Sequence, residues 1–410
     1  MTSPDLQNLY AEERRIELAR QLYPTIKEWE TRVVSIAPGE PSDWVVLSIH
    51  PAVILEQSAF GLPDEDRVQP YEALSYTWGA PVFSHPVVCN GVDFSVTHNL
   101  HAALVHLRYP DRERWVWIDA LCINQYDLHE KARQVKALYR IFERVAKTLV
   151  WLGQAGLEAT ASAERMLETL RGREPPRYGY DTGYDTMQQF IGVHTDILGR
   201  AWFSRVWIIQ EIAACQDSGK LEVHFGACIM SWKDLQMISE ARVSWRTTNT
   251  IDERCPGVAS LRLLQDITRR SRDFLFGQEE VTSLKDTPKV SFPDYIGQSP
   301  FRRLLRLLSR SVQCGFEATL AVDRIYSLVN VALNFCPGSR DTVLEALPID
   351  YEADLPTVLM HLAKLYINAE RTYTLPDVLS DAVLDRLLGP QRADHGRIAR
   401  LYGRRRSAGA

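Results

Sequence analysis

Short apolar runs bounded by turn residues recur between residues 44 and 153, a pattern that predicts β-strands. Strands are expected in "WVVLSIHPAVIL" (44–55), "YEALSYTW" (71–78), "RWVWIDALCINQ" (114–125) and "KTLVWLG" (147–153). Within "PVVCNGVDFSVT" the dipeptide Asn90-Gly91 predicts a hairpin turn. The chain therefore begins as a series of short strands.

Helical spacing separates these strands. In "THNLHAALVHLR" (97–108), Leu100, Leu104 and Leu107 share one face, and Thr97 or Asn99 can cap the helix. Asp127 and Glu130 have the spacing of a capping box and open a long amphipathic helix. The alternation of strands and helices predicts an α/β fold with a parallel sheet flanked by helices on both faces, with added hairpins.

The remaining segments suggest four regions. Residues 1–39 are expected to form an N-terminal helical segment, and 40–255 an α/β domain. Residues 155–200, with "RGREPPRYGYDTGYDT", suggest an exposed insertion or lid within it. After a helical stretch at 201–216 and a hairpin around Gly226, residues 256–375 are expected to form a mainly helical region with a polar loop at 277–300. The arginine-rich tail, 376–410, is expected to be poorly ordered.

Composition restricts the protein class. The 410 residues are 45% apolar and 24% charged, enough for a large core, and the net charge of -5 gives no global case for binding nucleic acid. No apolar run approaches the roughly 18 residues of a membrane span, and the polar N-terminus is unlike a signal peptide. We expect a soluble, cytoplasmic protein.

Cysteine and histidine patterns do not predict a metal site. The seven cysteines are scattered without a C-x2-C pair, so neither a disulfide framework nor a zinc knuckle is indicated. His98, His101 and His106 crowd one stretch, but they do not all share one helix face and no fourth ligand lies nearby. No bound metal is expected.

Polar side chains gather where two predicted strands end. Ser75, Tyr76 and Trp78 close one strand, while Asp119 and Asn124 follow another. Ligands of open α/β sheets bind at the carboxyl ends of the strands. These five residues are therefore candidates for substrate binding.

A second group lies in "WFSRVWIIQEI". Trp207, Gln210 and Glu211 fall on one helical turn, with Arg205 just before it. The alternative is structural, with the tryptophan in the core and Glu211 paired with Arg205. Spacing alone does not choose between these readings.

Several long motifs resemble the fungal heterokaryon-incompatibility (HET) domain. They are "YEALSYTWG" (71–79), "THNLHAALVHLR" (97–108), "WVWIDALCINQYDLHEKARQV" (115–135), "VWLG" (150–153) and "WFSRVWIIQE" (202–211). Downstream, 319–332 and 347–363 resemble the helical region that commonly follows this domain. The domain itself is similar to the Toll/interleukin-receptor (TIR) fold, a flavodoxin-like parallel sheet.

The resemblance implies a role in fungal self/non-self recognition and cell death. In NAD-cleaving TIR domains a glutamate follows a tryptophan on a helix, and "RVWIIQE" places that catalytic role on Glu211. Trp78 or Tyr76 would stack on a ring and Arg205 would hold a phosphate. NAD+ would be a substrate and no cofactor is expected. We expect Trp78, Asp119 and Glu211 to line one cavity.

Two other readings stay open. The chain could be a fungal secondary-metabolism enzyme that reuses the same pocket for another small molecule. It could also be a non-catalytic module that binds a protein partner or a second copy of itself. NAD+ turnover that depends on Glu211 would separate the first reading from these two.

Overall fold

The protein divides into two compact units. The computed structural model describes residues 17, 21–23, 25–27, 30–54, 70–172, 184–215, 217–241, 255–268, 300–334 and 347–370. The first unit holds residues 1–202 and 217–243, and the second holds 203–216 and 244–410. This division differs from the predicted domain boundary after residue 255, because the segment that contains Glu211 groups with the C-terminal helices.

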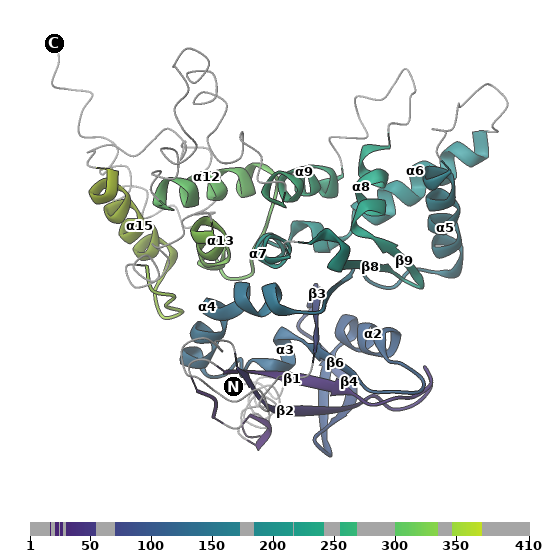
Figure 1. Ribbon diagram of the computed structural model, residues 1–410, viewed down its shortest axis with the longest axis horizontal. Coiled ribbons are helices and arrows are strands. Elements are labelled where there is room, and N and C mark those ends of the chain that lie inside the picture. Colours follow the sequence, from purple (N-terminus) through teal and green to yellow (C-terminus); the bar gives the residue numbers. More distant parts are fainter. Residues whose placement is uncertain are drawn as a thin grey trace, which may run out of the picture. The chain divides into compact units, whose positions relative to one another are not determined.

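A nine-stranded sheet forms the centre of the first unit (Figure 1). Its strand order is β5-β4-β2-β1-β6-β3-β7-β8-β9. The strands are β1 (Glu30–Ile36), β2 (Val46–Ile54), β3 (Glu72–Tyr76), β4 (Phe83–Cys89), β5 (Val92–Thr97), β6 (Arg114–Trp117), β7 (Lys147–Trp151), β8 (Leu221–Phe225) and β9 (Cys228–Ser231).

The sheet is mixed, so the expectation of a parallel sheet is correct only for its centre. Strands β6, β3, β7 and β8 run parallel, as do β2 and β4. Pairs β1–β2, β1–β6, β4–β5 and β8–β9 are antiparallel. The central strands β3 and β7 are buried on both faces, as expected of parallel strands covered by helices.

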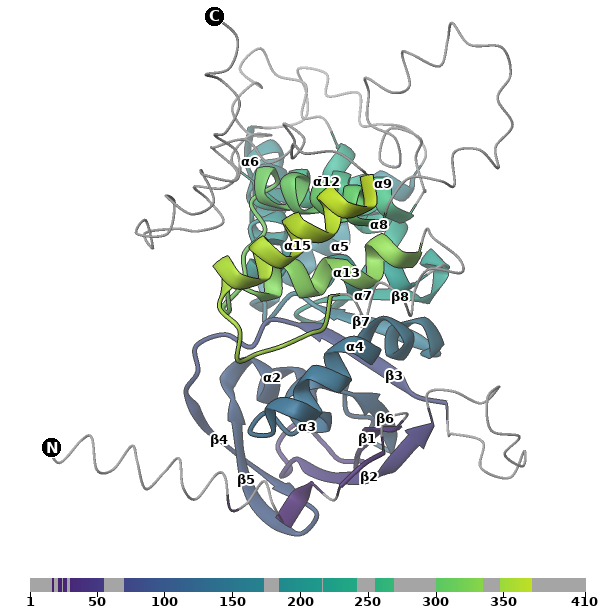
Figure 2. The ribbon, with the colours of Figure 1, turned by 90° about the vertical axis from the view of Figure 1, so that its left-hand side faces the viewer.

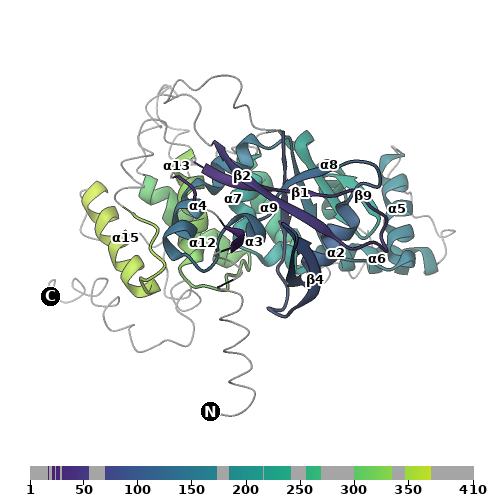
Figure 3. The same cartoon turned by 90° about the horizontal axis from the view of Figure 1, so that it is seen from below.

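Strand β1 corrects the predicted N-terminal helical segment, 1–39. Residues 30–36, "ETRVVSI", form a buried strand between β2 and β6 instead. Figure 3 shows β1 beside β2. The β-branched residues of this stretch favour a pleated, buried position, and this local signal outweighs the amphipathic pattern that precedes it.

Both predicted hairpins are present. Asn90 and Gly91 connect β4 to β5 with φ angles of 50° and 77°, the positive values that a type I′ turn requires. Gly226 lies in the turn between β8 and β9 with φ of 55°. These hairpins extend the parallel centre toward both edges of the sheet.

Helices cover both faces of the sheet, as the sequence predicts (Figure 2). Helix α2 (His98–Leu107), capped by Thr97, lies on the face of Trp151, and its Asn99 accepts a hydrogen bond from that indole. Helices α3 (Asp119–Cys122) and α4 (Leu128–Arg144) follow β6. Phe142 of α4 packs edge-on against Trp117. The strand register places the Trp117 side chain on the face of the sheet opposite to that of Trp151.

The predicted capping box at the start of α4 is only half formed. Asp127 accepts the backbone N–H of Glu130, as expected of an N-cap. The Glu130 carboxylate instead binds buried Arg32 of β1 through two hydrogen bonds, at 2.7 and 3.1 Å. A capping motif in the sequence has therefore become the anchor of α4 on the sheet.

Two helices occupy the described parts of residues 155–200, and that this segment is an exposed insertion or lid stays a prediction. Helices α5 (Leu157–Arg171) and α6 (Tyr184–Leu198) contact each other and α8 (Trp232–Glu240), beside β8 and β9. Ala163, Met166 and Leu167 bury one face of α5. The Gly-, Pro- and Tyr-rich residues 173–183 lie outside the described residues.

The second unit is helical, as predicted for its C-terminal part. It contains α7 (Trp207–Ala214), α9 (Pro256–Thr268), α12 (Pro300–Gln313), α13 (Asp323–Asn334) and α15 (Leu355–Glu370). Helix α13 packs on α7 and α12, and α15 contacts α12 (Figure 2). The predicted loop 277–300, apart from Pro300, and the tail 376–410 lie outside the described residues. Among the described helices, none is long and apolar enough to cross a membrane.

Candidate functional site

The strand order reverses in the parallel centre of the sheet. Strand β3 pairs with β6 on one side and with β7 on the other. The chain leaves β3 for β6 and then crosses back to β7. The loops after β3 and β7 therefore border a topological switch point, the usual ligand position of open α/β sheets.

Trp78 and Asp119 meet at this edge of the sheet. The Trp78 indole Nε1 donates to Asp119 Oδ2 at 2.9 Å, although Trp78 follows β3 and Asp119 begins α3 after β6. Asp119 Oδ1 accepts the backbone N–H of Ala120 at 2.7 Å, and its carbonyl accepts from Gln125. The carboxylate is thus held in a fixed orientation at the start of α3.

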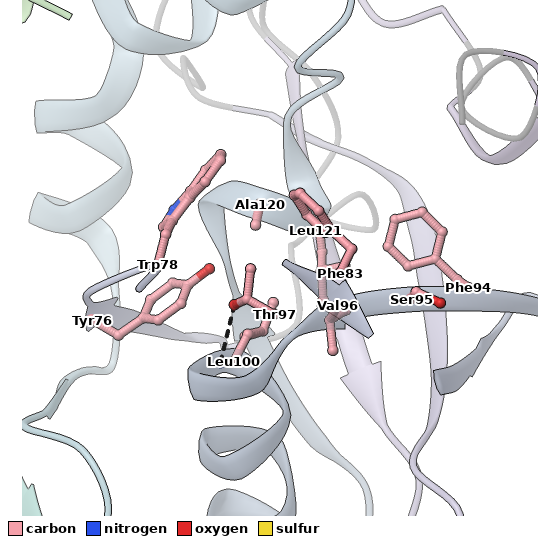
Figure 4. Close-up of a pocket in the computed structure, with 10 residues that line it drawn as sticks. All are labelled: Tyr76, Trp78, Phe83, Phe94, Ser95, Val96, Thr97, Leu100, Ala120 and Leu121. Atoms are coloured by element: carbon pink, nitrogen blue, oxygen red, sulfur yellow. Dashed lines mark hydrogen bonds between the residues drawn. The ribbon is translucent and has the colours of Figure 1, made fainter. Parts of the chain in front are cut away.

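A small, mainly apolar pocket opens beside this pair (Figure 4). Trp78 and Tyr76 form one side, and Phe83 and Phe94 from the β4–β5 hairpin extend across the other. The remaining lining comes from Ser95, Val96, Thr97, Leu100, Ala120 and Leu121. The lining is therefore mainly aromatic and aliphatic, with few polar groups.

Asn99 is a site residue that the sequence analysis considered only as a helix cap. Its amide Nδ2 donates to the Thr77 carbonyl at 2.6 Å and to Thr77 Oγ1 at 3.1 Å. Its Oδ1 accepts from Trp151 Nε1 at 3.0 Å. Asn99 therefore fixes the ends of β3 and β7 relative to each other. A polar side chain in the first turn of a helix after a capping threonine was the available signal.

The other three candidates of the first unit are Ser75, Tyr76 and Asn124. Ser75 is fully buried and its hydroxyl accepts from Trp202 Nε1 at 2.8 Å, so it stabilises the β3 face opposite the pocket. Tyr76 is buried and lines the pocket. Asn124 accepts the backbone N–H of Tyr126, and its own N–H donates to Glu130.

The other four candidates belong to the second unit. Glu211 is buried, with its Oε1 3.9 Å from Arg205 Nη1. Gln210 accepts a hydrogen bond from Asn330 Nδ2 at 3.1 Å. Trp207 Nε1 donates a hydrogen bond to Asp323 Oδ2 at 3.3 Å. These contacts join α7 to α13. That Glu211 shares a cavity with Trp78 and Asp119 stays a prediction, because the latter belong to the first unit.

A row of polar side chains runs beneath α2, buried at His224 and partly exposed at Lys147. His106 bonds His224 between ring nitrogens 3.1 Å apart, His224 bonds Glu222 at 3.0 Å, and Lys147 Nζ lies 2.6 Å from Glu222. Burial, with His224 and Arg114 nearby, lowers the pKa of His106 to about 4. The His224 and Lys147 hydrogen bonds lower the pKa of Glu222 to about 2. These side chains join α2 to the starts of strands β7 and β8, away from the pocket.

Comparisons with known proteins agree with the motifs. Residues 71–211 match the family model described as heterokaryon incompatibility protein (HET). Over 229 residues, 45% of this chain, the sequence is 27% identical to "Heterokaryon incompatibility protein 6, OR allele" of Neurospora crassa. That stretch covers 34% of the relative, so the chain spans about a third of its length. No solved structure matches the chain. The two matches support the HET family for residues 71–211, the region that contains every candidate site residue.

Proposed function

We propose that this chain acts in fungal self/non-self recognition as a heterokaryon-incompatibility effector that triggers cell death. The main support is the HET match over residues 71–211. The Neurospora relative, named for heterokaryon incompatibility, points in the same direction. We place the protein in the cytoplasm, where such an effector would encounter the contents of a fused cell.

We further propose that the effector cleaves NAD+ at a TIR-like site. The parallel strands β6-β3-β7-β8 follow the chain in the order 2-1-3-4, which is the beginning of the flavodoxin-like order 2-1-3-4-5. This order supports a TIR-like centre with antiparallel additions at both sides. The candidate residues Trp78 and Asp119 follow the first and second strands of that series.

The chemistry requires a binding surface for the ring and an acidic group beside the ribose. Cleavage breaks the bond between ribose C1′ and the nicotinamide nitrogen, whose positive charge is neutralised by the electron pair of that bond. Water then adds to C1′ and loses a proton. A carboxylate stabilises the oxocarbenium-like transition state, and Glu211 has this role by resemblance. By the same resemblance, Trp78 or Tyr76 would stack on the ring and Arg205 would bind a phosphate.

The test is NAD+ consumption by the purified full chain at high protein concentration, because clustering could be required. Glu211→Gln keeps the shape of the side chain and removes its charge, while Glu158→Gln changes an exposed carboxylate at the start of α5. We expect turnover by the wild type and by Glu158→Gln, with loss in Glu211→Gln. No turnover by correctly folded wild type would refute NAD+ cleavage.

One observation favours a second candidate, a non-catalytic interaction module. The Glu211 side chain is only 6% exposed and lies beside Arg205, an arrangement that fits an ion pair supporting α7. In that case the wild type and Glu211→Gln would bind the same partner, or self-associate equally, and expression in a fungal host would arrest growth without NAD+ loss. A small-molecule enzyme of secondary metabolism would instead leave the host unharmed.

A further inference from the structure

Helix α7, which carries Glu211, is too short to hold its own position. It has eight residues, and its N-cap residue Val206 makes no side-chain capping hydrogen bond. A helix of about two turns is marginal on its own in water, so its place is set by what packs on it. Although the HET match runs through Glu211, α7 groups with the C-terminal helices and contacts α13 and α9. The position of Glu211 therefore depends on residues outside that match.

Helix α13 presents a polar stripe toward α7. Asp323, Ser327 and Asn330 have the spacing i, i+4, i+7, which places them on one face of the helix. Asp323 Oδ2 accepts a hydrogen bond from Trp207 Nε1 at 3.3 Å. Asn330 Nδ2 donates to Gln210 Oε1 at 3.1 Å. Because Trp207 and Gln210 lie one turn apart on α7, the two bonds oppose rotation of α7 about its axis and sliding along α13.

Burial gives these two hydrogen bonds, the α7–α13 seam, their directing effect. Gln210 and Asn330 are fully buried, and Asp323 is buried as well. A buried polar group that loses its partner costs more free energy than a typical hydrogen bond contributes. A satisfied polar network inside a protein favours one arrangement of the elements that it joins. The seam therefore fixes the direction in which the α7 side chains point.

Asp323 is itself held by a third segment of the second unit. The Tyr351 hydroxyl donates to Asp323 Oδ1 at 3.0 Å, so each carboxylate oxygen accepts from a different element. The Tyr351 ring packs edge-on against Tyr326 of α13, with ring centroids 5.6 Å apart. The Tyr326 hydroxyl donates in turn to the Asp350 carbonyl at 2.8 Å. These contacts keep the acceptor for Trp207 in place.

The residues just ahead of α7 are fixed through the backbone. Val206 N–H donates to the Glu317 carbonyl at 2.9 Å, and Glu317 N–H donates to the Ser204 carbonyl. Arg205 forms the resulting parallel bridge with Glu317. Its Nη1 lies 3.9 Å from Glu211 Oε1. The arginine and the acid are thus held by separate contacts, the backbone bridge for Arg205 and the seam for Glu211.

We propose that Asp323 and Asn330 are positioning residues that aim Glu211 at the substrate in NAD+ cleavage. The inference rests on the proposed function, in which the Glu211 carboxylate stabilises the transition state. Both residues act through Trp207 and Gln210, which precede Glu211 on the same helix. Electrostatic stabilisation requires a preorganised group, so a movement of α7 that displaces the carboxylate by about 1 Å lowers the rate. The C-terminal helices thereby take part in catalysis.

NAD+ cleavage by the purified full chain tests this role. Asn330→Leu and Asp323→Leu introduce a side chain of similar size that cannot form the hydrogen bond. We expect kcat to fall by about 10- to 100-fold in each, with KM within about twofold of the wild-type value because substrate binding is not altered. Gln313→Leu is the matched control and should retain the wild-type kcat. Its glutamine is exposed at the end of α12 and bonds Ser309 of its own helix.

A conservative change separates positioning from other effects at Asp323. In Asp323→Asn the amide oxygen accepts from Trp207, and the amide nitrogen donates to the Tyr351 hydroxyl, which is able to accept. This variant should recover most of the kcat lost in Asp323→Leu. Tyr351→Phe removes the bond to Asp323 Oδ1 alone and should lower kcat by less than Asp323→Leu does. A full loss in folded Asp323→Asn would assign the effect to the carboxylate charge and overturn the positioning role of Asp323.

Hydrogen exchange supplies a readout that does not depend on activity. Amide hydrogens of residues 207–214 should exchange about tenfold or more faster in Asn330→Leu and Asp323→Leu, with exchange in β3 and β7 unchanged. Circular dichroism of each variant confirms that it is folded. Unchanged exchange in α7 would overturn the role of the seam, whether or not NAD+ is cleaved.

Activity and exchange together distinguish the remaining outcomes. Faster exchange in α7 with the wild-type kcat, or a rise in KM at constant kcat, would overturn the positioning role while leaving NAD+ cleavage intact. No cleavage by folded wild type would refute the proposed function, and the positioning role with it. Exchange in α7 would then still decide whether α13 holds this helix.

Discussion

The Trp151 indole donates to Asn99 Oδ1 at 3.0 Å, and this bond joins helix α2 to the end of strand β7. The same asparagine donates from its Nδ2 to Thr77 at the end of β3. One side chain therefore supplies both the acceptor and the donor that tie α2 to the ends of two parallel strands. The loops that border the switch point depend on the Asn99 amide, because an amide carries both a hydrogen-bond donor and an acceptor.

Asn99→Asp should destabilise the first unit. Aspartate keeps an acceptor for Trp151 but cannot donate to the Thr77 carbonyl, and it places a negative charge beside that oxygen. We expect a cost of about 1–3 kcal/mol in unfolding free energy, measured by urea denaturation. Asn124→Asp is the control, because the Asn124 side chain accepts from Tyr126 and aspartate can do the same. Equal effects of the two changes would contradict the role given to Asn99.

Glu130→Gln tests the buried anchor of α4. Arg32 is fully buried and its guanidinium has two hydrogen bonds to this carboxylate. Neutralising one partner leaves a buried charge uncompensated, which costs about 3–5 kcal/mol. Urea denaturation should show this loss, and the double variant Arg32→Met/Glu130→Leu should recover much of it because neither charge remains. A cost below about 1 kcal/mol in Glu130→Gln would show that the pair contributes little.

Acid should destabilise the fold through His106. Its pKa is about 4 in the folded protein, below the usual value of 6.5, because of burial and the nearby His224 and Arg114. Between these two values the unfolded chain binds more protons, so the stability contribution is lost as pH falls from about 6.5 toward 4.

The measurement compares unfolding free energy at pH 7 and pH 5. Removing the titrating ring in His106→Gln should reduce the difference between the two pH values, although the variant is less stable at pH 7 without the bond to His224. His129→Gln, which changes an exposed ring on α4, should keep the full wild-type difference. A difference that is unaltered in His106→Gln would assign the acid sensitivity to other groups.

Local patterns predicted the strands and hairpins well, because those signals lie within a few residues. The apolar run 44–55 contains β2, and Asn90-Gly91 forms the expected turn. Topology was harder to predict, because the antiparallel partner β1 comes from a segment whose neighbours have a helical pattern. The packed helices α5 and α6 were missed because Gly, Pro and Tyr between them dominate the composition.

The candidate site was partly predictable for the same reason. Trp78 and Asp119 each follow a strong strand signal, and parallel strands bring their carboxyl ends to one edge, so their contact could be expected. The role of Asn99 could not, because its partners Thr77 and Trp151 are 22 and 52 residues away. Sequence spacing also gave no sign that α7 groups with the C-terminal helices.

Gly226→Ala should be more damaging than the same change in the other hairpin. A Cβ at Gly226 would lie 2.8 Å from Ala155 Cβ and 2.9 Å from its backbone nitrogen, so the backbone must move. At Gly91 the same atom meets nothing within 4 Å. Both glycines have positive φ, so Gly91→Ala isolates the conformational cost of about 1–2 kcal/mol. Gly226→Ala should add a steric cost, and urea denaturation should show a clearly larger loss of unfolding free energy. Equal losses would mean that the loop before α5 yields freely, and that its contact with the β8–β9 turn contributes little to the first unit.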